Sequence, residues 1–441
     1  MSEKFSHPRY DLRNLRYNCY PLVPFWKHVP TQDEWFSSAQ NSLTLPDSKI
    51  SIYIHIPFCE SFCSFCACNT VTTIDHSVEL PYLETIYKEL ELYILKVPEI
   101  LEAKVVELQL GGGSPNFISE NNLENLLNFL FSKLKFISNP ELSIEVNPNK
   151  TSKEQLEVLS KFGFKTISIG VEDFDESVLS FINKEGSFAE VKMITEAVRE
   201  FGFNTVNFNL IYGLPNQTKK SIHEMMDKIN ILQPERVTFH EYLHVPWIKD
   251  YERLFTVQDL PIQEERTEFF ELGKTLLLNL GYIHLGMEQF VKPNDELYLA
   301  QKENRLQRRF TGYTSIKPNL LLGLGVSAIS ESETFYHQNI KILKKYQKFI
   351  SENTLPSFKG HHKTEEDRIQ SQIIFNLETN LRAKILSLNN IRDRLRRFES
   401  NGDILLNGEE LILTEKGRAS LGEICAVFDH HLQNHLPVQN K

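Results

Sequence analysis

The sequence predicts an α/β protein built as a partial (β/α) barrel, with an extended N-terminal arm before it and a mostly helical, winged-helix-like domain after it. Two observations carry this prediction. Short β-branched runs alternate with amphipathic stretches between residues 50 and 245, and this rhythm stops beyond residue 360. Strands and helices that alternate at intervals of roughly 25–35 residues are typical of βαβ units, and therefore of a parallel sheet.

Six segments are predicted as strands because they are short, apolar and β-branched. They cover residues 50–56, 105–111, 142–148, 166–173, 205–213 and 236–245. Apolar residues at helical spacing mark the segments between them, at 121–134, 153–164, 187–203 and 219–232. In such folds the chemistry lies at the C-terminal ends of the strands, and the unusual residues of this chain follow the strands.

We divide the chain into an arm (1–49), a barrel domain (50–335) and a C-terminal domain (336–441). The arm is rich in aromatic residues and prolines. The last part predicts helices at 364–377 and 386–402, then a hairpin that turns at Asn407-Gly408, then a helix at 416–432. This order resembles a winged-helix module. Nucleic-acid binding is one interpretation, but we favour a structural cap over the barrel mouth.

Composition excludes several classes of protein. The net charge of −10 argues against a nucleic-acid binder driven by bulk electrostatics. The chain has no secretory apolar region near its start and no apolar run of about 18 residues, so we expect a cytoplasmic protein without a membrane segment. We also expect it to be a monomer. Of its six cysteines, four lie between Cys59 and Cys68. In the cytoplasm such clustered cysteines bind metal more often than they form disulfides.

The cysteines follow the first predicted strand in a CxxxCxxCxC pattern. Thiolates suit iron–sulfur clusters and zinc. Cys59, Cys63 and Cys66 can hold three irons of a [4Fe–4S] cluster and leave the fourth open to S-adenosylmethionine (SAM), whose reductive cleavage yields a 5′-deoxyadenosyl radical. A zinc knuckle is the alternative, but no second ligand pair follows at zinc-like spacing. Cys68 would close the cluster, so we place it beside the cluster or on the substrate side.

Two further signals follow the next strands. Gly111-Gly112-Gly113 comes directly after the second strand, where glycines allow close backbone approach and carbonyl contact with the SAM amino group. Glu145 ends the third strand, in the place where a carboxylate can bind ribose hydroxyls. Each feature alone is usually a turn or a solvated rim residue. Their position one and two βα units after the cysteines favours SAM binding.

These motifs together resemble one family, the oxygen-independent coproporphyrinogen III dehydrogenases (oxidases), which are radical SAM enzymes of haem biosynthesis. The resemblance spans nearly the whole chain. It rests on RYNCYP (16–21), the four cysteines, GGGSP, SIEVNP, IGVEDF (169–174), LIYGLP (210–215), FTGYT (310–314), LLGLGVSAIS (321–330) and the C-terminal LTEKGR and ICAVFD. Related haem chaperones generally lack the fourth cysteine and much of the C-terminal half.

The resemblance implies contacts to the cluster-bound SAM from Tyr53, Gly112, Glu145 and Ile329, with Phe65 beside it. It also implies a second SAM, contacted by Gly113, Ser114, Glu172, Lys184, Asn209 and Leu243. At the last four of these positions the family has Gln, Arg, Asp and Ala. The three polar residues Glu172, Lys184 and Asn209 have a net charge of zero, as do the Gln, Arg and Asp of the family, but Lys lacks the bidentate geometry of Arg. We expect this pocket to bind a polar ligand with altered geometry, or to have drifted neutrally.

The resemblance implies oxidative decarboxylation of two propionates of coproporphyrinogen III, giving protoporphyrinogen IX, with a flavodoxin- or ferredoxin-type electron donor. The porphyrinogen is a tetra-anion, so basic groups should converge near the barrel mouth. Arg13, Arg16, Arg308 and Arg309 are the candidates. Two alternatives stay open: radical chemistry on another substrate (methyl transfer, cyclopropanation or haem-ring opening), and a haem-binding chaperone.

Overall fold

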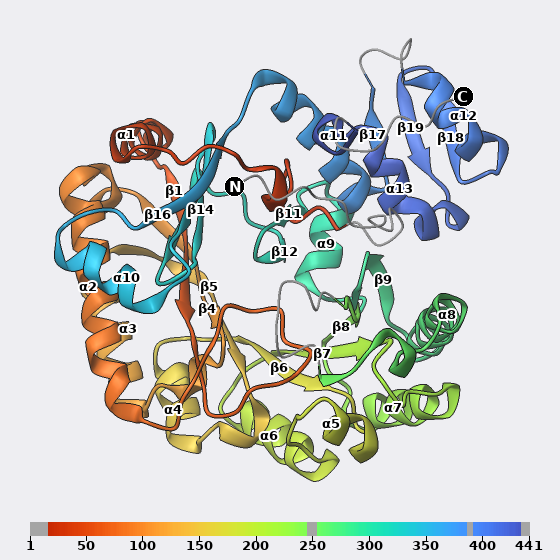
Figure 1. Cartoon of the computed structure of the whole chain (residues 1–441), viewed down its shortest axis with the longest axis horizontal. Coiled ribbons are helices and arrows are strands. Elements are labelled where there is room, and N and C mark those ends of the chain that lie inside the picture. Colours follow the sequence, from red (N-terminus) through yellow and green to blue (C-terminus); the bar gives the residue numbers. More distant parts are fainter. Residues whose placement is uncertain (1–15, 245–253, 386–390, 434–441) are drawn as a thin grey trace.

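The structure is a computed structural model that describes residues 16–244, 254–385 and 391–433. One large sheet is built from β1 (Lys49–Ile56), β4 (Lys104–Gly112), β5 (Lys135–Val146), β6 (Thr166–Glu172), β7 (Thr205–Tyr212), β8 (Arg236–Glu241), β9 (Ile283–Gly286), β10 (Gln289–Val291), β13 (Leu320–Leu324), β14 (Ile329–Glu331), β15 (Phe335–Asn339) and β16 (Ser357–His362). Its strand order is β16-β15-β14-β13-β1-β4-β5-β6-β7-β8-β10-β9. From β13 through β1 to β8 neighbouring strands are parallel, whereas both edges are antiparallel. The sheet therefore curves into an open barrel (Figure 1).

The parallel strands confirm the predicted βα rhythm. All six predicted strands are present, and most of their ends lie within a few residues of the predicted ones. β5 begins earlier than predicted, at Lys135, and β8 ends at Glu241. The predicted end of the last strand, residue 245, lies outside the described residues. The parallel strand β13 was not predicted as a strand. Helices cover the outer side of the sheet in Figure 1. The helices of this part are α1 (Gln32–Ser42), α2 (Glu79–Lys96), α3 (Glu120–Lys133), α4 (Lys153–Lys161), α5 (Glu176–Phe181), α6 (Phe188–Glu200), α7 (Lys219–Leu232), α8 (Gln263–Asn279), α9 (Glu296–Lys302) and α10 (Leu343–Ser351).

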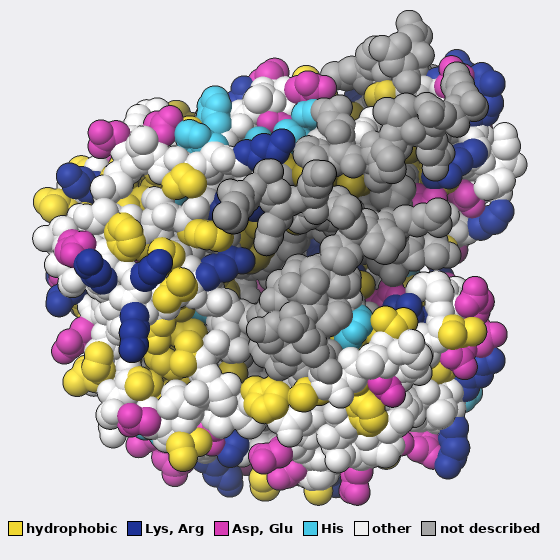
Figure 2. All heavy atoms as spheres, viewed as in Figure 1, with side chains coloured by type: hydrophobic (Ala, Val, Ile, Leu, Met, Phe, Trp, Pro, Cys, Tyr) yellow, Lys and Arg dark blue, Asp and Glu magenta, His cyan; other side chains and the backbone are white. Residues whose placement is uncertain are grey.

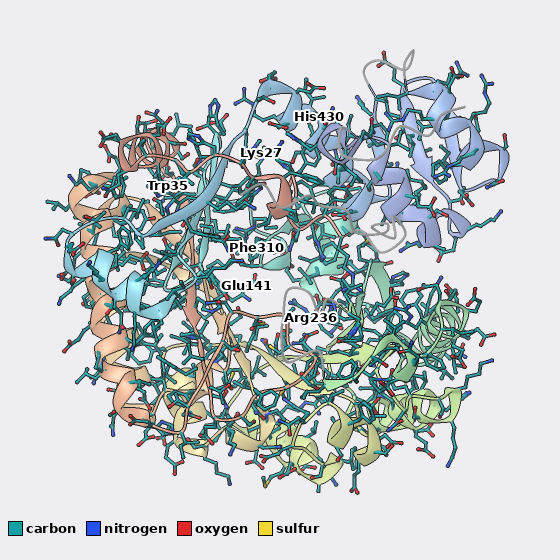
Figure 3. All side chains as sticks on the ribbon, viewed as in Figure 1. Lys27, Trp35, Glu141, Arg236, Phe310 and His430 are labelled. Atoms are coloured by element: carbon teal, nitrogen blue, oxygen red, sulfur yellow. The ribbon has the colours of Figure 1, made fainter. Side chains whose placement is uncertain are left out.

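Alternation along β1 explains why the barrel has two different faces. Ile50, Ile52 and Ile54 are at most 1% exposed and join the main apolar core under the helices. The residues between them, including Tyr53 and His55, point to the opposite, concave face because side chains alternate along a strand. Polar residues follow this face on later strands too, and Figure 3 shows Glu141 and Arg236 inside the curve of the sheet. The barrel interior is therefore suited to polar ligands.

The C-terminal module has its own core and its own sheet. It contains α11 (Glu365–Asn380), β17 (Arg382–Lys384), α12 (Arg392–Ser400), β18 (Ile404–Asn407), β19 (Glu410–Leu413), α13 (Leu421–Ala426) and α14 (His430–Gln433), and its strand order is β17-β19-β18. The predicted hairpin is confirmed, with Asn407 opposite Glu410. Figure 1 shows this module beside the barrel opening. The remaining short strands form two pairs, β2 (Phe58–Cys59) with β3 (Val71–Thr72) and β11 (Gln307–Arg309) with β12 (Gly312–Thr314).

The arm is not wholly extended as predicted. Its described part contains α1, which begins with a capping box between Thr31 and Glu34. That signal sits in the sequence TQDE, and the helix then buries Trp35. Before α1, the arm joins the C-terminal core: the Tyr17 hydroxyl donates to Asp429 Oδ2 at 2.9 Å. The arm therefore links the barrel to the C-terminal module.

The expected boundary at 335/336 falls inside β15, and the main sheet continues through β16 to His362. The structure therefore places the change of architecture after His362. The helix predicted over 416–432 is also wrong as a single element, because it divides into a 3₁₀ turn, α13 and α14. Asp429 accepts a hydrogen bond from Leu432 N at 2.9 Å and so starts a new helix.

Among the described helices, none is long and apolar enough to cross a membrane.

Candidate active site

A cavity of about 710 Å³ opens at the C-terminal ends of the parallel strands, where the barrel architecture predicts it. The cysteine loop forms one wall and the strand ends β4 to β8 form the other. Among the predicted residues, those that line it are Arg16, Cys59, Cys63, Phe65, Cys66, Cys68, Gly112, Gly113, Ser114, Glu145, Glu172, Lys184, Asn209 and Leu243. The structure thus brings together fourteen of the residues that the sequence singled out, from eight separate segments.

Hydrogen bonds at both ends hold the cysteine loop over the cavity. Near its start and end, Val71 N donates to Pro57 O at 2.8 Å and Thr73 N donates to Cys59 O at 2.9 Å. In its middle, Ser64 N donates to Ile182 O at 3.0 Å, which ties the loop to the turn after α5. Within the described residues, Cys59, Cys63, Cys66 and Cys68 form no disulfide, and all four line the same cavity. This arrangement can present several sulfur ligands to one metal centre.

Burial favours the protonated form of the thiols unless a cation binds them. Burial and the two neighbouring thiols raise the pKa of Cys59 to about 12, and burial raises the pKa of Cys63 to about 11. The Lys184 ammonium opposes both shifts but does not cancel them. Thiolates at these positions therefore need a bound cation for their stability, and soft sulfur ligands suit iron. The three cysteines fit a [4Fe–4S] cluster on this ground.

The glycine run seats the cysteine loop. A Cβ at Gly113 would lie 2.7 Å from Pro57 O and 2.9 Å from Phe58 O, so only glycine fits there. Gly113 N also donates to Ile56 O at 2.8 Å. The backbone of β4 therefore runs directly against the start of the cysteine loop. This close approach is a structural reason for the glycines that the sequence did not reveal.

Glu145 lies buried at the end of β5, beside the glycine run. Its Oε2 accepts from Gly112 N at 3.4 Å and its Oε1 accepts from Gln109 Nε2 at 3.3 Å. Burial raises the pKa of this carboxyl group. Both hydrogen bonds are long, and the carboxylate faces the cavity, so it is placed to accept bonds from ligand hydroxyls.

Two of the residues expected at the first SAM do not line this cavity. The Tyr53 ring packs under Gly111, within 2.9 Å of the place where a Cβ would lie, and its hydroxyl meets His55 Nδ1 at 3.2 Å. Ile329 is 2% exposed on β14, where it packs with Trp26 and Tyr336. Contact between Ile329 and SAM therefore stays a prediction that the cavity does not support.

The four positions of the altered pocket meet at one side of the cavity. Lys184 Nζ lies 4.0 Å from Glu172 Oε1, and both side chains are nearly buried. Burial raises the pKa of Glu172 to about 7, and Lys184 opposes that shift. Asn209 Oδ1 accepts from Asn207 Nδ2 at 2.9 Å, and Leu243 is 45% exposed at the rim. The pocket is polar and nearly neutral overall.

The basic candidates separate into two groups. Arg16 lines the cavity, and its Nη1 meets His240 Nδ1 at 2.9 Å. Arg308 and Arg309 instead form buried ion pairs, with Glu288 at 2.9 Å and with Glu107 at 2.7 Å. The prediction that Arg308 and Arg309 are available to bind the substrate is therefore wrong. Arg13 lies outside the described residues.

Sequence reasoning missed His240, which burial keeps neutral by lowering its pKa to about 4. Its inward position on β8 follows from alternation in RVTFHE, where Val237 and Phe239 join the core. Lys150 was also missed; it lines the cavity and pairs with Glu60 at 2.8 Å. No local motif marks Lys150, because its place depends on the loop after β5.

The chain matches known proteins over most of its length. Residues 53–229 match the family described as the Radical SAM superfamily. The oxygen-independent coproporphyrinogen III oxidase of Pseudomonas aeruginosa is 33% identical, over 96% of this chain and 95% of that protein. The oxidase of the same name from a Synechocystis strain is 31% identical, over 97% of this chain and 94% of its own length.

A solved structure agrees with these sequences. The coproporphyrinogen III oxidase of Escherichia coli, described as a radical SAM enzyme, superimposes with a TM-score of 0.89 at 30% identity, and the match covers 94% of this chain and 97% of that one. The fold and the cysteine cavity thus define a radical SAM enzyme, with a [4Fe–4S] cluster and SAM as its cofactors. Within that class, the chain belongs to the family of oxygen-independent coproporphyrinogen III oxidases.

Proposed function

We propose that the chain catalyses the oxidative decarboxylation of two propionate side chains of coproporphyrinogen III, giving protoporphyrinogen IX in haem biosynthesis. The observation that carries this proposal is the cavity itself, in which three clustered thiols and the Arg16–His240 pair face the same space. Whole-length similarity to oxidases named for this substrate supports it.

The residues of the cavity have distinct roles in this proposal. Cys59, Cys63 and Cys66 would hold the cluster, while Glu145 and the end of β4, which line the same cavity, would hold the SAM. When bound, these cofactors would supply a carbon radical able to remove a hydrogen atom from the β-carbon of a propionate. The apolar wall at Phe65 lies against a buried apolar cluster behind the loop and limits the entry of water.

The cavity is lined by carboxylates as well as cations, so the contact with an acidic substrate depends on individual cations. Three cationic side chains line it among the described residues, and two of them, Lys150 and Lys184, already face carboxylates. Arg16 contacts neutral His240, and its charge also helps to lower the pKa of buried Glu288 nearby. Its guanidinium can therefore bind a propionate in bidentate form and orient the porphyrinogen. Because Arg16 belongs to the arm, the arm becomes part of the substrate site.

A protein electron donor, of flavodoxin or ferredoxin type, is part of the same proposal. Helix α10 lies next to the cysteine loop, since Asn69 Nδ2 donates to Lys341 O at 3.1 Å. Exposed Lys344, Lys345 and Lys348 follow on that helix, although the chain as a whole is acidic. Figure 2 shows basic side chains gathered with hydrophobic ones over α10. This basic surface near the cluster loop suits an acidic donor.

The cytoplasmic location and the monomeric state stay predictions. A cytoplasmic location agrees with an iron–sulfur cluster that needs a reducing compartment.

A second candidate function, radical chemistry on another substrate, is favoured by one observation. The Glu172–Lys184 pair differs from the residues that the family resemblance implies at this pocket.

An anaerobic assay separates these possibilities. Cluster-loaded protein is mixed with a reductant, SAM and coproporphyrinogen III, and the products are analysed by mass spectrometry. Loss of two carboxyl groups together with 5′-deoxyadenosine supports the proposal. If 5′-deoxyadenosine forms while the porphyrinogen stays intact, another substrate is indicated. Tight stoichiometric haem binding without SAM turnover would indicate a chaperone instead.

A further inference from the structure

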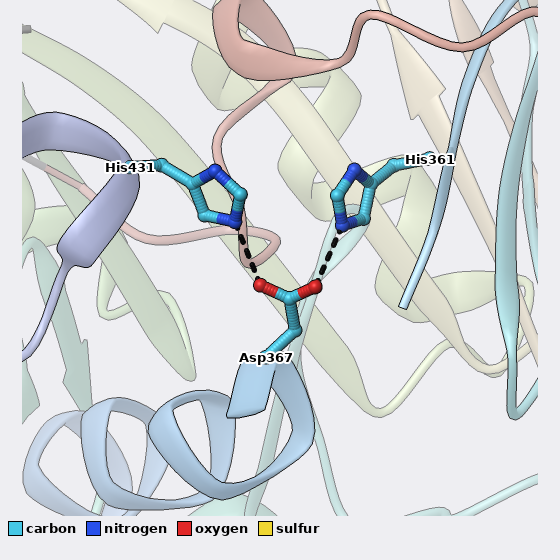
Figure 4. A group of neighbouring side chains, drawn as sticks. All are labelled: His361, Asp367 and His431. Atoms are coloured by element: carbon cyan, nitrogen blue, oxygen red, sulfur yellow. Dashed lines mark hydrogen bonds and ion pairs between the residues drawn. The ribbon is translucent and has the colours of Figure 1, made fainter. Parts of the chain in front are cut away.

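Two histidines converge on one buried carboxylate, far along the chain from the cysteines. His361 Nε2 lies 2.9 Å from Asp367 Oδ2, and His431 Nε2 lies 2.7 Å from Asp367 Oδ1 (Figure 4). The three ligand atoms lie within 4.8 Å of one another. Asp367 is 1% exposed, whereas the side chains of His361 and His431 are 13% and 22% exposed. The group is therefore largely shielded but reachable from solvent.

We propose that His361, Asp367 and His431 form a binding site for one first-row divalent transition-metal ion, with Zn²⁺ as the best-suited probe. Two imidazole nitrogens and one carboxylate oxygen are a common donor set for Zn²⁺ and related ions. Both rings already direct their Nε2 atoms at the same carboxylate, His361 at Oδ2 and His431 at Oδ1. An ion bound there takes the place of the hydrogen bonds between the two Nε2 atoms and the carboxylate, and each neutral ring then keeps its proton on Nδ1 and offers the Nε2 lone pair.

The carboxylate is held in place by contacts that leave one oxygen for the ion. Asp367 is the third residue of α11 and completes a capping box with Thr364. Its Oδ2 accepts from Thr364 N at 2.9 Å and from Thr364 Oγ1 at 2.8 Å. Outer hydrogen bonds of this kind orient a ligating carboxylate. Oδ1 has the His431 ring as its nearest imidazole partner and remains the natural ligand atom.

The site borders a cavity of about 520 Å³, which leaves room for a fourth ligand. That cavity is also lined by His28 and Glu34 of the arm and by Phe335 of β15. A water molecule or one of the polar arm side chains can complete a tetrahedral shell there. Figure 3 shows Lys27 of the arm and His430 of the C-terminal module along the same junction.

The position of the site gives it a structural role. His361 belongs to β16 at the edge of the main sheet, Asp367 to the start of α11 and His431 to α14 of the C-terminal module. An ion bound by all three fastens the module to the barrel. Because the unfolded chain does not hold the three ligands together, binding stabilises the folded state. This inference is independent of the proposed function.

The test uses cluster-loaded protein under anaerobic conditions, so that iron occupies the cysteines. Equilibrium dialysis against Zn²⁺, followed by elemental analysis, should give one zinc per chain in addition to the iron. We expect His361→Ala and His431→Ala to weaken that binding at least tenfold, and Asp367→Asn to weaken it as well. The control is His223→Ala on α7, an exposed histidine far from the site, which should bind zinc as the wild type does.

Wild-type protein that binds no stoichiometric zinc, or variants that bind it as His223→Ala does, would overturn the proposal. Thermal melts in chelator check that the variants fold, and zinc should then raise the melting temperature of the wild type but not of the variants. If the variants fail to fold, the Co²⁺ spectrum of the wild type decides. Ligand-field bands of a nitrogen and oxygen site support the proposal, whereas sulfur charge-transfer bands or no bands contradict it.

Discussion

Lys184 Nζ lies 4.0 Å from Glu172 Oε1 inside the cavity that the cysteine thiols face. The two side chains come from the turn after α5 and from the end of β6, so the fold brings opposite charges together where the family resemblance implies Arg and Gln. A pocket whose cation is already paired has less attraction left for a second anionic group. We therefore expect the pair to influence what this side of the cavity binds.

The first prediction concerns the number of SAM molecules bound. We expect wild-type protein to bind one SAM per cluster, and the variant Glu172→Gln/Lys184→Arg/Asn209→Asp/Leu243→Ala to bind two. The substitutions remove the acid beside the cation, restore a bidentate group and shorten the side chain at the rim. Equilibrium dialysis with labelled SAM measures both stoichiometries. Two molecules bound equally tightly by wild type would show that the altered pocket still works as the resemblance implies.

The glycine run gives a prediction on assembly of the site. Gly113→Ala should destabilise the protein by about 1–3 kcal/mol, because the new Cβ would overlap Pro57 O and push the cysteine loop away. Cluster occupancy, measured as iron per chain, should fall with it. Gly163→Ala is the matched control: its φ of +89° costs backbone strain, but its Cβ meets nothing within 4 Å. Full iron content in Gly113→Ala would contradict this explanation.

The basic surface on α10 predicts a dependence on the electron donor. Lys344→Glu/Lys345→Glu should lower the turnover rate about tenfold with a flavodoxin at low ionic strength, because charge attraction speeds docking. With dithionite, a small reductant, the rate should stay unchanged. Lys302→Glu/Lys384→Glu, two exposed lysines on α9 and β17, is the control. Equal losses with both reductants would mean that the lysines act on the site itself.

Buried Glu89 predicts a pH dependence of stability. Burial raises the pKa of this carboxyl group from 4.5 to about 7, against hydrogen bonds from Tyr346, Gly325 N and Asn339. Between these two values the unfolded chain ionises first, so the folded state loses stability as the pH rises from 4.5 to 7.

We therefore expect Glu89→Gln to gain about 2 kcal/mol relative to wild type when the pH rises from 5.5 to 8. Denaturant unfolding at both pH values measures this difference in the free energy of unfolding. Glu84→Gln, at an exposed position of α2, should show no such gain. A constant difference between Glu89→Gln and wild type would mean that Glu89 does not titrate in this range.

The barrel was predictable because its signals are local. Alternation in KISIYIHI fixes which face of β1 meets the helices, and the spacing of Cys59, Cys63 and Cys66 needs no knowledge of distant segments. The strand ends then follow from the architecture, which gathers Glu145, Glu172 and Asn209 around one cavity. The order of motifs thus indicated the cysteines, the glycine run and Glu145, whereas Glu172, Lys184, Asn209 and Leu243 were implied by the family resemblance.

The misses depend on pairings between distant segments. Arg309 reaches Glu107, about two hundred positions away, and Arg308 reaches Glu288, so no local pattern marks either arginine as buried. The single helix expected at the C-terminal end is interrupted at Asp429, which accepts hydrogen bonds from Leu432 N and from the hydroxyl of distant Tyr17. The His361–Asp367–His431 group escaped notice because its members come together only when the C-terminal module docks.

The most direct test of the central claim follows one hydrogen atom. Coproporphyrinogen III labelled with deuterium at the β-carbons of its propionates is given to cluster-loaded protein with reductant and SAM, without oxygen. If the radical removes that hydrogen, deuterium should appear in the 5′-deoxyadenosine, in proportion to the vinyl groups formed. Vinyl groups formed with unlabelled 5′-deoxyadenosine, or labelled substrate recovered with both propionates intact, would contradict the account.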